Sequence, residues 1–173
     1  MSDKAITVEI ASPAERPLLA GLMQFYIYDF SELQPEGAAG FVFDGEGRYP
    51  DYLQLPNYWM EVDRTPLVIR AGDEVAGFAL LNRHSHVGGS PDHNMAEFFV
   101  ARKYRRRGVA REAVREILAR FRGRWEVAIL ERNTGARAFW PQAIAAAPNV
   151  TELALHPGDG DAWNGPVWTF LAV

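Results

Sequence analysis

Residues 104–111 read "YRRRGVAR" and join three consecutive arginines to a glycine and a small apolar pair. Within this stretch Arg105, Gly108 and Ala110 form the pattern Arg-x-x-Gly-x-Ala. Guanidinium groups contact phosphate through paired hydrogen bonds, and glycine allows phosphate oxygens to approach the backbone. If a helix begins at the glycine, its free N–H groups and positive dipole end complete an anion site. The stretch therefore predicts a loop for a small phosphorylated ligand, with a basic patch for nucleic acid as the alternative.

The charge distribution favours the small ligand. The chain has a net charge of −4, yet ten of its 18 Lys and Arg residues fall between Arg102 and Arg124, opposed there only by Glu112 and Glu116. A nucleic-acid-binding protein is usually basic over a whole face, whereas the remainder of this chain is acidic. We therefore expect no nucleic-acid partner. The arginines beyond the loop are also explained by a solvated helix face, with Glu112 placed to pair with Arg115.

A second group of polar residues is the His84-x-His86 pair, with Asp92 and His93 close behind. On a strand, two histidines at this spacing share one face, as a metal site requires. The segment continues into "VGGSPDHN", however, whose glycines and proline favour a polar loop. We therefore expect no metal here.

The composition limits the class of protein. The chain has 173 residues, which suits a single domain over 1–173, and it has no cysteine, which excludes disulfides, thiolate nucleophiles and cysteine-ligated zinc. The first ten residues do not have the pattern of a signal peptide. The longest apolar runs are too short to cross a bilayer, so we expect a cytoplasmic protein without a membrane partner.

The elements that must position the loop are predicted by periodicity. Residues 5–10 alternate as a strand, and a helix follows from Ser12, with Glu15 completing a capping box, to about Phe30. Residues 35–56 are irregular and rich in Gly and Pro. A hairpin over 66–82 and a strand over 95–101 lead into the arginine loop.

After the loop, the apolar period changes to that of a helix, which starts at Gly108 and ends near 121–123. A strand over 125–130 precedes a helix capped by Asn133, which Pro141 would kink or shorten. Strands are expected over 150–155 and 166–173. The predicted order is therefore βα, an irregular segment, ββ, βαβα and ββ.

Two motifs on the central βαβα unit resemble those of the GCN5-related N-acetyltransferase (GNAT) superfamily. Its phosphate loop, [Q/R]-x-x-G-x-[G/A] after the fourth strand, is matched by residues 105–110. Its second signature is matched by Asn133, Ala136 and the pair Phe139-Trp140. The resemblance covers roughly residues 66–146. It implies an α/β (α+β) fold, in which a mixed, mostly antiparallel sheet of about six to seven strands is flanked by helices.

The resemblance also implies the ligand and its contacts. Acetyl-CoA would be the co-substrate, and the acceptor would be a primary amine of a small molecule or a protein. Backbone groups at the end of the fourth strand would pair with the pantetheine and polarise the thioester, the loop would wrap the pyrophosphate, and an asparagine would contact the pantetheine. These cofactor-binding residues are Phe98, Phe99, Val100, Arg105, Arg106, Arg107, Gly108, Val109, Ala110 and Asn133.

Catalytic and acceptor residues are less fixed by the family pattern. Many relatives carry a Tyr where this chain has Trp140, and an indole N–H is too weak an acid to protonate the departing thiolate. Glu97 is the first candidate for the general base, with His93 as a minor one and a structural ion pair as an equal alternative for Glu97. Tyr26, Tyr28 and Asp29 are expected near the acceptor.

Three functions follow from the sequence. The leading hypothesis is an acetyl-CoA-dependent N-acetyltransferase. The second is a CoA-binding protein of this fold with lost or altered catalysis, motivated by Trp140, and the third is a nucleic-acid-binding module that uses the Arg102–Arg124 cluster. Many relatives dimerise, so a homodimer is a further expectation, while the acceptor stays unidentified.

Overall fold

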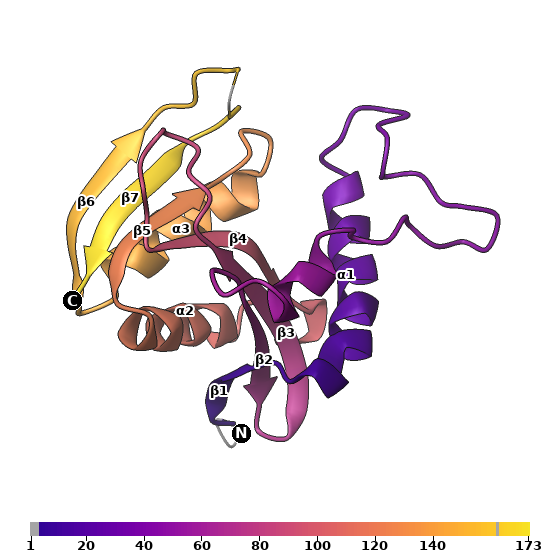
Figure 1. The fold of residues 1–173 in the computed structure, drawn as a ribbon, viewed down its shortest axis with the longest axis horizontal. Helices are drawn as coiled ribbons and strands as arrows, with labels where there is room; N and C mark the ends of the chain where they lie inside the picture. The colour runs from indigo at the N-terminus through magenta and orange to yellow at the C-terminus, as the bar shows by residue number, and fades with distance from the viewer. Residues whose placement is uncertain (1–3, 162) are drawn as a thin grey trace.

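The computed structural model describes residues 4–161 and 163–173, and their strands form one sheet with the order β1-β2-β3-β4-β5-β7-β6 (Figure 1). All neighbouring strands are antiparallel except β4 and β5, which are parallel. The predicted fold class and order of elements are thereby confirmed. The helices and strands are β1 (Ile6–Ile10), α1 (Arg16–Ser31), β2 (Thr65–Ala71), β3 (Glu74–Asn82), β4 (His93–Val100), α2 (Val109–Arg120), β5 (Gly123–Ala128), α3 (Thr134–Ala145), β6 (Val150–His156) and β7 (Val167–Ala172).

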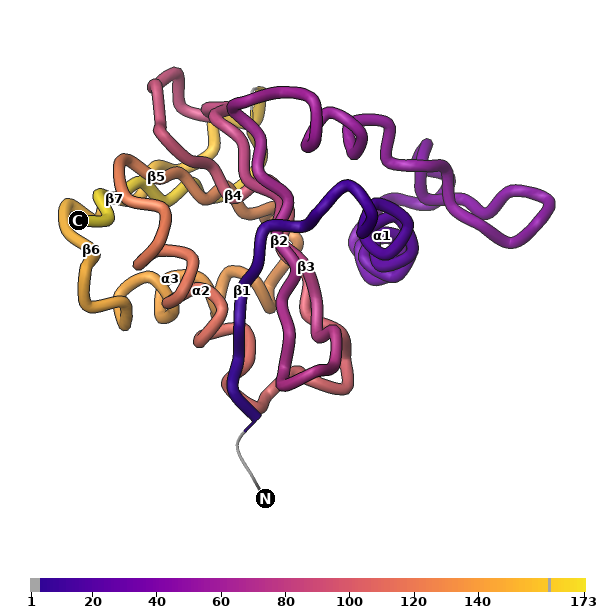
Figure 2. The backbone as a smooth tube through the Cα atoms, turned by 60° about the horizontal axis from the view of Figure 1, so that its bottom comes forward, coloured from indigo at the N-terminus to yellow at the C-terminus, as the bar shows by residue number. Residues whose placement is uncertain are grey.

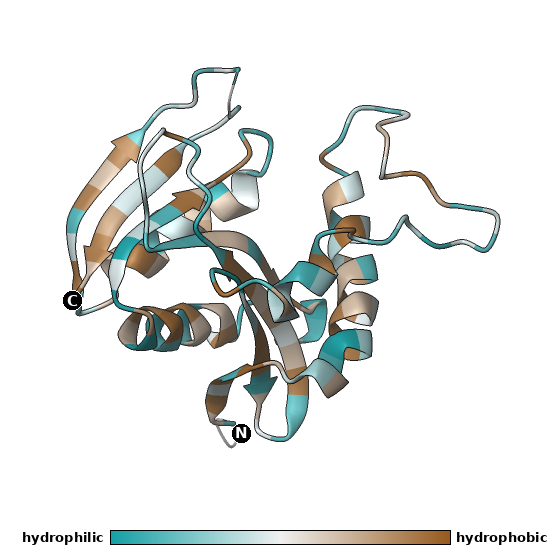
Figure 3. Ribbon diagram, in the orientation of Figure 1, coloured by the Kyte–Doolittle hydropathy of each residue, from teal (hydrophilic) through white to brown (hydrophobic). Residues whose placement is uncertain are grey.

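Helices cover the sheet from both sides. Helix α1 lies on one face, while α2 and α3 lie on the other (Figure 2). Because successive strand residues point to opposite faces, each inner strand supplies apolar side chains to both layers. The two buried clusters show this alternation: Val68 packs with Leu19 and Met23 of α1, whereas Ile69 packs with Ile117 of α2. Figure 3 shows brown, hydrophobic segments along the inner strands of the sheet.

The helix ends follow the local signals of the sequence. The carboxylate of Glu15 accepts hydrogen bonds from the Ser12 backbone N–H at 2.8 Å and its hydroxyl at 3.0 Å, so the predicted capping box is present. A 3-10 turn over Pro13–Glu15 precedes α1. Helix α3 begins after Asn133, as predicted, and continues past Pro141 to Ala145.

Strands β4 and β5 pair over only two positions. His93 lies opposite Trp125 and Asn94 lies opposite Glu126, and no later pair joins them among the described residues. Strand β4 nevertheless stays paired with β3 as far as Val100, and β5 stays paired with β7 as far as Ala128. The sheet therefore divides beyond Asn94 into two parts that diverge. Between Met95 and Glu97 the register of β4 shifts by one residue, so that Ala96 forms a bulge at the point of division.

The irregular segment over 35–56 extends away from the sheet beside α1 (Figure 1). It returns where Gln24 of α1 holds the backbone of Tyr49, donating to its carbonyl at 3.1 Å and accepting from its N–H at 2.9 Å. This attachment carries Tyr52 back to the sheet. Among the described residues, no helix is long and apolar enough to span a membrane.

Candidate active site

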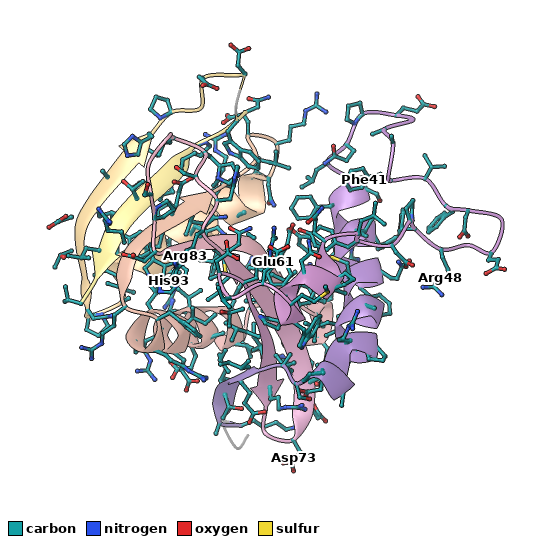
Figure 4. All side chains as sticks on the ribbon, in the orientation of Figure 1. Phe41, Arg48, Glu61, Asp73, Arg83 and His93 are labelled. Carbon is teal, nitrogen blue, oxygen red and sulfur yellow. The ribbon has the colours of Figure 1, made fainter. Side chains whose placement is uncertain are left out.

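A cleft of about 480 Å³ opens where β4 and β5 diverge. One wall is β4 and the opposite wall is the end of β5 with the start of α3. Residues of α1, of the 35–56 segment and of the 83–92 loop, together with Trp163, complete the lining. Figure 4 shows Phe41 at the end of α1 and Arg83 and His93 nearer the middle of the sheet. After Asn94, the edge of β4 that faces this cleft has no partner strand among the residues that the structure describes, which leaves backbone N–H and C=O groups for a bound chain.

The arginine loop lies at the far end of the same strand. Arg106 and Gly108 both have left-handed backbones, with φ of 62° and 80°, and Gly108 is the N-cap of α2. An ideal Cβ at Gly108 would meet no atom within 4 Å, so space is open in front of the helix start. The N–H groups of the first turn of α2 have no acceptor within the helix. The helix therefore starts at Gly108, as the sequence predicts, and the binding of an anion by this loop stays a prediction.

Arg105 fastens this loop to the end of β4. Its Nε donates to the carbonyl of Val100 at 2.6 Å, and its guanidinium pairs with Asp29 of α1. Arg102 also pairs with Asp29, at 2.7 Å. Burial raises the pKa of Asp29, but hydrogen bonds from the two arginines outweigh it, so the pKa falls below its usual value. Asp29 thus holds the loop against α1.

Glu97 lies on the face of β4 that packs against α1, with a tyrosine hydroxyl on each oxygen. Tyr26 of α1 donates to Oε2, and Tyr52 from the irregular segment donates to Oε1 at 3.1 Å. Burial raises the pKa of Glu97, and the two hydroxyl donors offset part of that rise. A carboxyl with a raised pKa in a cleft is suited to accept a proton near neutral pH.

Tyr26 and Tyr52 stay protonated near neutral pH. Burial and the neighbouring Glu97 carboxylate both raise the pKa of Tyr26, and the same causes raise that of Tyr52. Each hydroxyl therefore acts as a donor to Glu97. This arrangement differs from the structural ion pair considered as the alternative for Glu97, because no arginine or lysine contacts it among the described residues.

Three aromatic rings form the wall between β4 and α3. Phe98 meets the edge of Trp140 with ring centroids 5.1 Å apart and stacks on Phe139 at 6.2 Å. Trp140 is 7% exposed and its ring also contacts Phe139. At the position of the family tyrosine, this chain therefore places a buried packing residue whose indole supplies no proton.

The predicted residues divide into those that line the cleft and those that do not. Glu97, Phe98, Asn133 and Tyr26 line it. Phe99 and Val100, at the end of β4, are buried in the two core clusters on opposite faces of the sheet, and Val109 is buried at the start of α2, so their contribution is limited to backbone groups. The predicted roles of Arg105, Arg106, Arg107, Gly108, Val109 and Ala110 rest on the loop at the end of β4, outside the lining itself.

Three predicted residues lie elsewhere. Tyr28 is 52% exposed beside Arg102, and Asp29 faces the loop, so neither lines the cleft and their acceptor contacts stay predictions. His93 points to the α2 side, where its ring packs on Trp125 and its Nε2 lies 3.2 Å from the Arg122 carbonyl. Of the two candidate bases, only Glu97 lines the cleft.

Two features of the site were missed from the sequence. Tyr52 lies in an irregular segment with no local signal that it meets Glu97. Glu126 is 1% exposed and binds His86, and this carboxylate interrupts the apolar run "WEVAIL", which was a usable signal.

No group of three or more His, Cys, Asp or Glu side chains suited to a metal is present in the part of the chain that the structure describes.

Comparison with known proteins places this geometry in a family. The model of the acetyltransferase (GNAT) family matches residues 24–143. No curated protein matches the sequence. The fold is shared with an acetyltransferase from Thermus thermophilus, at 16% identity over 100% of both chains with a TM-score of 0.67.

Two further solved structures contain coenzyme A. Spermidine N-acetyltransferase from Vibrio cholerae, in complex with CoA and spermine, is 10% identical over 95% of this chain and 93% of its own, with a TM-score of 0.56. PaiA N-acetyltransferase from Thermoplasma acidophilum, in complex with coenzyme A, is 9% identical over 98% and 99%, with a TM-score of 0.60. Since the family model spans most of the sequence, the chain belongs to the GNAT acetyltransferase family.

Proposed function

We propose that the protein is an acetyl-CoA-dependent N-acetyltransferase that transfers acetyl directly to a primary amine of a small molecule or protein. The observation that carries the proposal is the unpaired edge of β4, which runs from the division of the sheet to a glycine-led helix start. That path suits a ligand with a phosphate at one end and an extended amide chain at the other. Family membership supports the same donor.

In the bound state, the chain's own groups would divide the ligand between them. The amides around Gly108 and the first turn of α2 would hold the pyrophosphate, with Arg106 and Arg107 near its charge. The free edge of β4 over 95–100 and the amide of Asn133 would bind the pantetheine. Asn133 already uses its Oδ1 to cap α3, accepting from Ala136 N at 3.0 Å, so its Nδ2 is the group left to donate.

Glu97 would act as the general base. The amine nitrogen attacks the thioester carbonyl carbon, the C–S bond breaks, and the thiolate of CoA leaves. Glu97 takes the proton that the attacking ammonium must lose, directly or through water. A backbone N–H of β4 would stabilise the charge that develops on the carbonyl oxygen. Trp140 supplies packing only, so we propose that the thiolate departs without a proton from α3.

Two other functions are less well supported. A CoA-binding protein without catalysis would explain Trp140 but not the carboxylate held between two tyrosines in the cleft. A nucleic-acid module would use the basic Arg102–Arg124 cluster, yet five of its ten basic side chains already pair with acidic ones: Arg102, Lys103, Arg105, Arg115 and Arg124. We propose one acetyltransferase domain over 1–173 that acts in the cytoplasm, without a nucleic-acid or membrane partner. A homodimer stays a prediction.

Calorimetric titration with acetyl-CoA tests the donor site. The wild-type protein should bind, and Gly108→Glu should lose binding because it places a carboxylate where phosphate belongs. Gly108→Asn tolerates the left-handed backbone and should bind more tightly than the glutamate variant, which separates charge from strain. Gly45→Glu adds the same charge on the irregular segment, where a Cβ meets no atom within 4 Å, and should bind as the wild type does. Unchanged binding by Gly108→Glu would refute this donor site.

A further inference from the structure

Glu126 is a buried carboxylate at the point where the sheet divides. It is 1% exposed and lies in register with Asn94, which in turn lies opposite Asn82. Its hydrogen bonds come from the 83–92 loop: Ser85 Oγ donates at 2.8 Å, the His86 backbone N–H donates, and His86 Nδ1 lies at 3.0 Å. Burial raises the pKa of Glu126, but the bonds from His86 and Ser85 outweigh it, and the net pKa is lowered. Glu126 is therefore an acceptor only.

This carboxylate determines which ring nitrogen of His86 carries the proton. An ionised Glu126 can only accept, so His86 must carry its proton on Nδ1, and a neutral ring then has Nε2 as a hydrogen-bond acceptor. The imidazole lines the cleft. Trp163 packs against its ring with centroids 4.5 Å apart, which limits rotation. In the neutral imidazole, Nε2 would be a second oriented acceptor in the cleft in addition to Glu97.

Five side-chain donors near these acceptors already donate within the protein. Tyr26 and Tyr52 donate to Glu97, Ser85 donates to Glu126, Asn94 Nδ2 donates to Asn82 Oδ1 at 2.8 Å, and Trp163 Nε1 donates to the Ile129 carbonyl at 3.2 Å. Asn94, which is 1% exposed and lines the cleft, has an Oδ1 that accepts from no group in the described chain. The described residues of this region therefore include a buried acceptor, Asn94 Oδ1, that receives no donor.

The lining of the cleft contains an acidic side chain and no arginine or lysine. Glu97 is among the described residues that line the cleft, whereas none of them is Lys or Arg. A bound carboxylate would lose its water here without gaining a cationic partner, which is costly in free energy. A bound ammonium would meet Glu97, Nε2 of a neutral His86 and the aromatic side chains of Phe30, Phe41 and Trp163.

From these contacts we infer that the acceptor is a cationic amine that carries no carboxylate, and that the Glu126–His86 pair helps to bind its N–H donors. The inference rests on the proposed N-acetyltransferase function and specifies its acceptor class. Glu126 acts as a positioning residue for His86, while His86 determines specificity. α-Amino acids are excluded by charge, even where their side-chain amines match an accepted substrate in length and shape.

Pairs of amines that differ only by a carboxylate test the acceptor class. Thiol release from acetyl-CoA is measured with cadaverine against lysine, tyramine against tyrosine, and tryptamine against tryptophan. We expect kcat/KM to favour the carboxylate-free member by at least tenfold in every pair that reacts. Gln34→Arg, which adds a cation to the lining, should reduce that preference at least threefold.

The role of His86 is tested by a split of kinetic constants. His86→Gln should raise the KM of the amine at least fivefold and leave the KM of acetyl-CoA unchanged, and Glu126→Gln should reproduce part of this effect. The matched control is His156→Gln, whose ring contacts Thr169 on the outer strands at 2.9 Å and should leave both KM values unchanged.

Acetyl-CoA calorimetry separates failure of this inference from failure of the proposed function. If acetyl-CoA does not bind, the proposed function is refuted and the inference falls with it. If acetyl-CoA binds but the amino acids react equally well or better, or no carboxylate-free amine reacts, the inference is refuted and the donor site stands. An unchanged amine KM in His86→Gln overturns the role of that residue.

Discussion

Glu97 receives hydrogen bonds from two tyrosines that come from different parts of the chain. Tyr26 lies on α1, and Tyr52 lies on the segment that returns to the sheet after Tyr49. Burial raises the pKa of the carboxyl, while the hydroxyl donors favour its ionised form and lower it. A general base must be ionised and must also have a pKa high enough to accept a proton. The two opposing effects on the Glu97 carboxyl act on these two requirements.

Removing one donor should move the acid limb of the pH–rate profile. In Tyr52→Phe the ionised form of Glu97 loses a hydrogen bond, so its pKa rises further and the limb shifts to higher pH. The limb is measured as kcat/KM against pH. Tyr49→Phe is the matched control, since its hydroxyl donates to Ser31 Oγ at 3.2 Å and does not contact Glu97. A limb that stays in place in Tyr52→Phe would mean that another group titrates.

Replacing Glu97 itself should separate catalysis from folding. Glu97→Gln should lower kcat at least a hundredfold, the usual scale for a lost general base, and keep acetyl-CoA binding. Because the folded-state pKa is raised, the folded protein binds more protons, and the stability from this group falls as pH rises through that pKa. At pH 8 the neutral amide should therefore leave the melting temperature unchanged or higher. A lower melting temperature with normal turnover would assign Glu97 a structural role instead.

At the scale of elements, the buried carboxylate of Glu126 on β5 binds the 83–92 loop. Glu126→Gln weakens three hydrogen bonds, so urea denaturation should show a loss of about 1–3 kcal/mol at pH 7. The pKa of Glu126 is lowered on folding, so this stability exists above the unfolded pKa and is lost as pH falls through the folded one. The variant and the wild type should thus converge in acid.

Glu131→Gln is the matched control for this prediction. Glu131 pairs with Arg137 at 2.6 Å on the surface, where such pairs contribute little, so its loss should cost less than about 1 kcal/mol. Equal costs in the two variants, or a difference that persists in acid, would contradict the account of Glu126.

Substitution of Gly77 tests the contact between β3 and β4, with a second glycine as the control. A Cβ on Gly77 would lie 1.9 Å from the Phe99 carbonyl oxygen, so Gly77→Ala must force β4 away from β3. We expect a loss of about 1–3 kcal/mol, as for other overpacked sites. Gly21→Ala on α1 meets no atom within 4 Å and should stabilise the helix by up to about 1 kcal/mol. Thermal unfolding measures both, and a stable Gly77→Ala would contradict this strand pairing.

The sequence predicted the helices and strands better than it predicted the contacts between them. The loop around Gly108 and the cap at Asn133 are local patterns, and both were found. The division of β4 from β5 is a matter of register, and the bulge at Ala96 has no signal in hydrophobic period. The contact of Tyr52 with Glu97 joins residues 45 apart through an irregular segment, and Tyr28 and Asp29 were predicted by position on a helix whose rotation the sequence left open.

At the scale of the whole molecule, the divided sheet separates two tasks. The strands β1–β4, α1 and the irregular segment supply Glu97 and its two tyrosines, while β5 and the start of α3 form the opposite wall with Asn133. The arginine loop, fastened to α1 through Asp29, closes the far end of β4. Donor and acceptor would therefore meet in one cleft, the donor along β4 and the acceptor between α1 and the 83–92 loop.

The most direct test of the account is thiol release from acetyl-CoA in the presence of cadaverine, with the product identified by mass. We expect N-acetylcadaverine from the wild type and from Gly45→Glu. We expect none from Gly108→Glu, which should not bind the donor. Glu97→Gln should bind acetyl-CoA but release thiol at least a hundredfold more slowly. Acetyl transfer that is equally fast in wild type, Gly108→Glu and Glu97→Gln would contradict the account, as would a wild-type protein that binds acetyl-CoA and acetylates no amine.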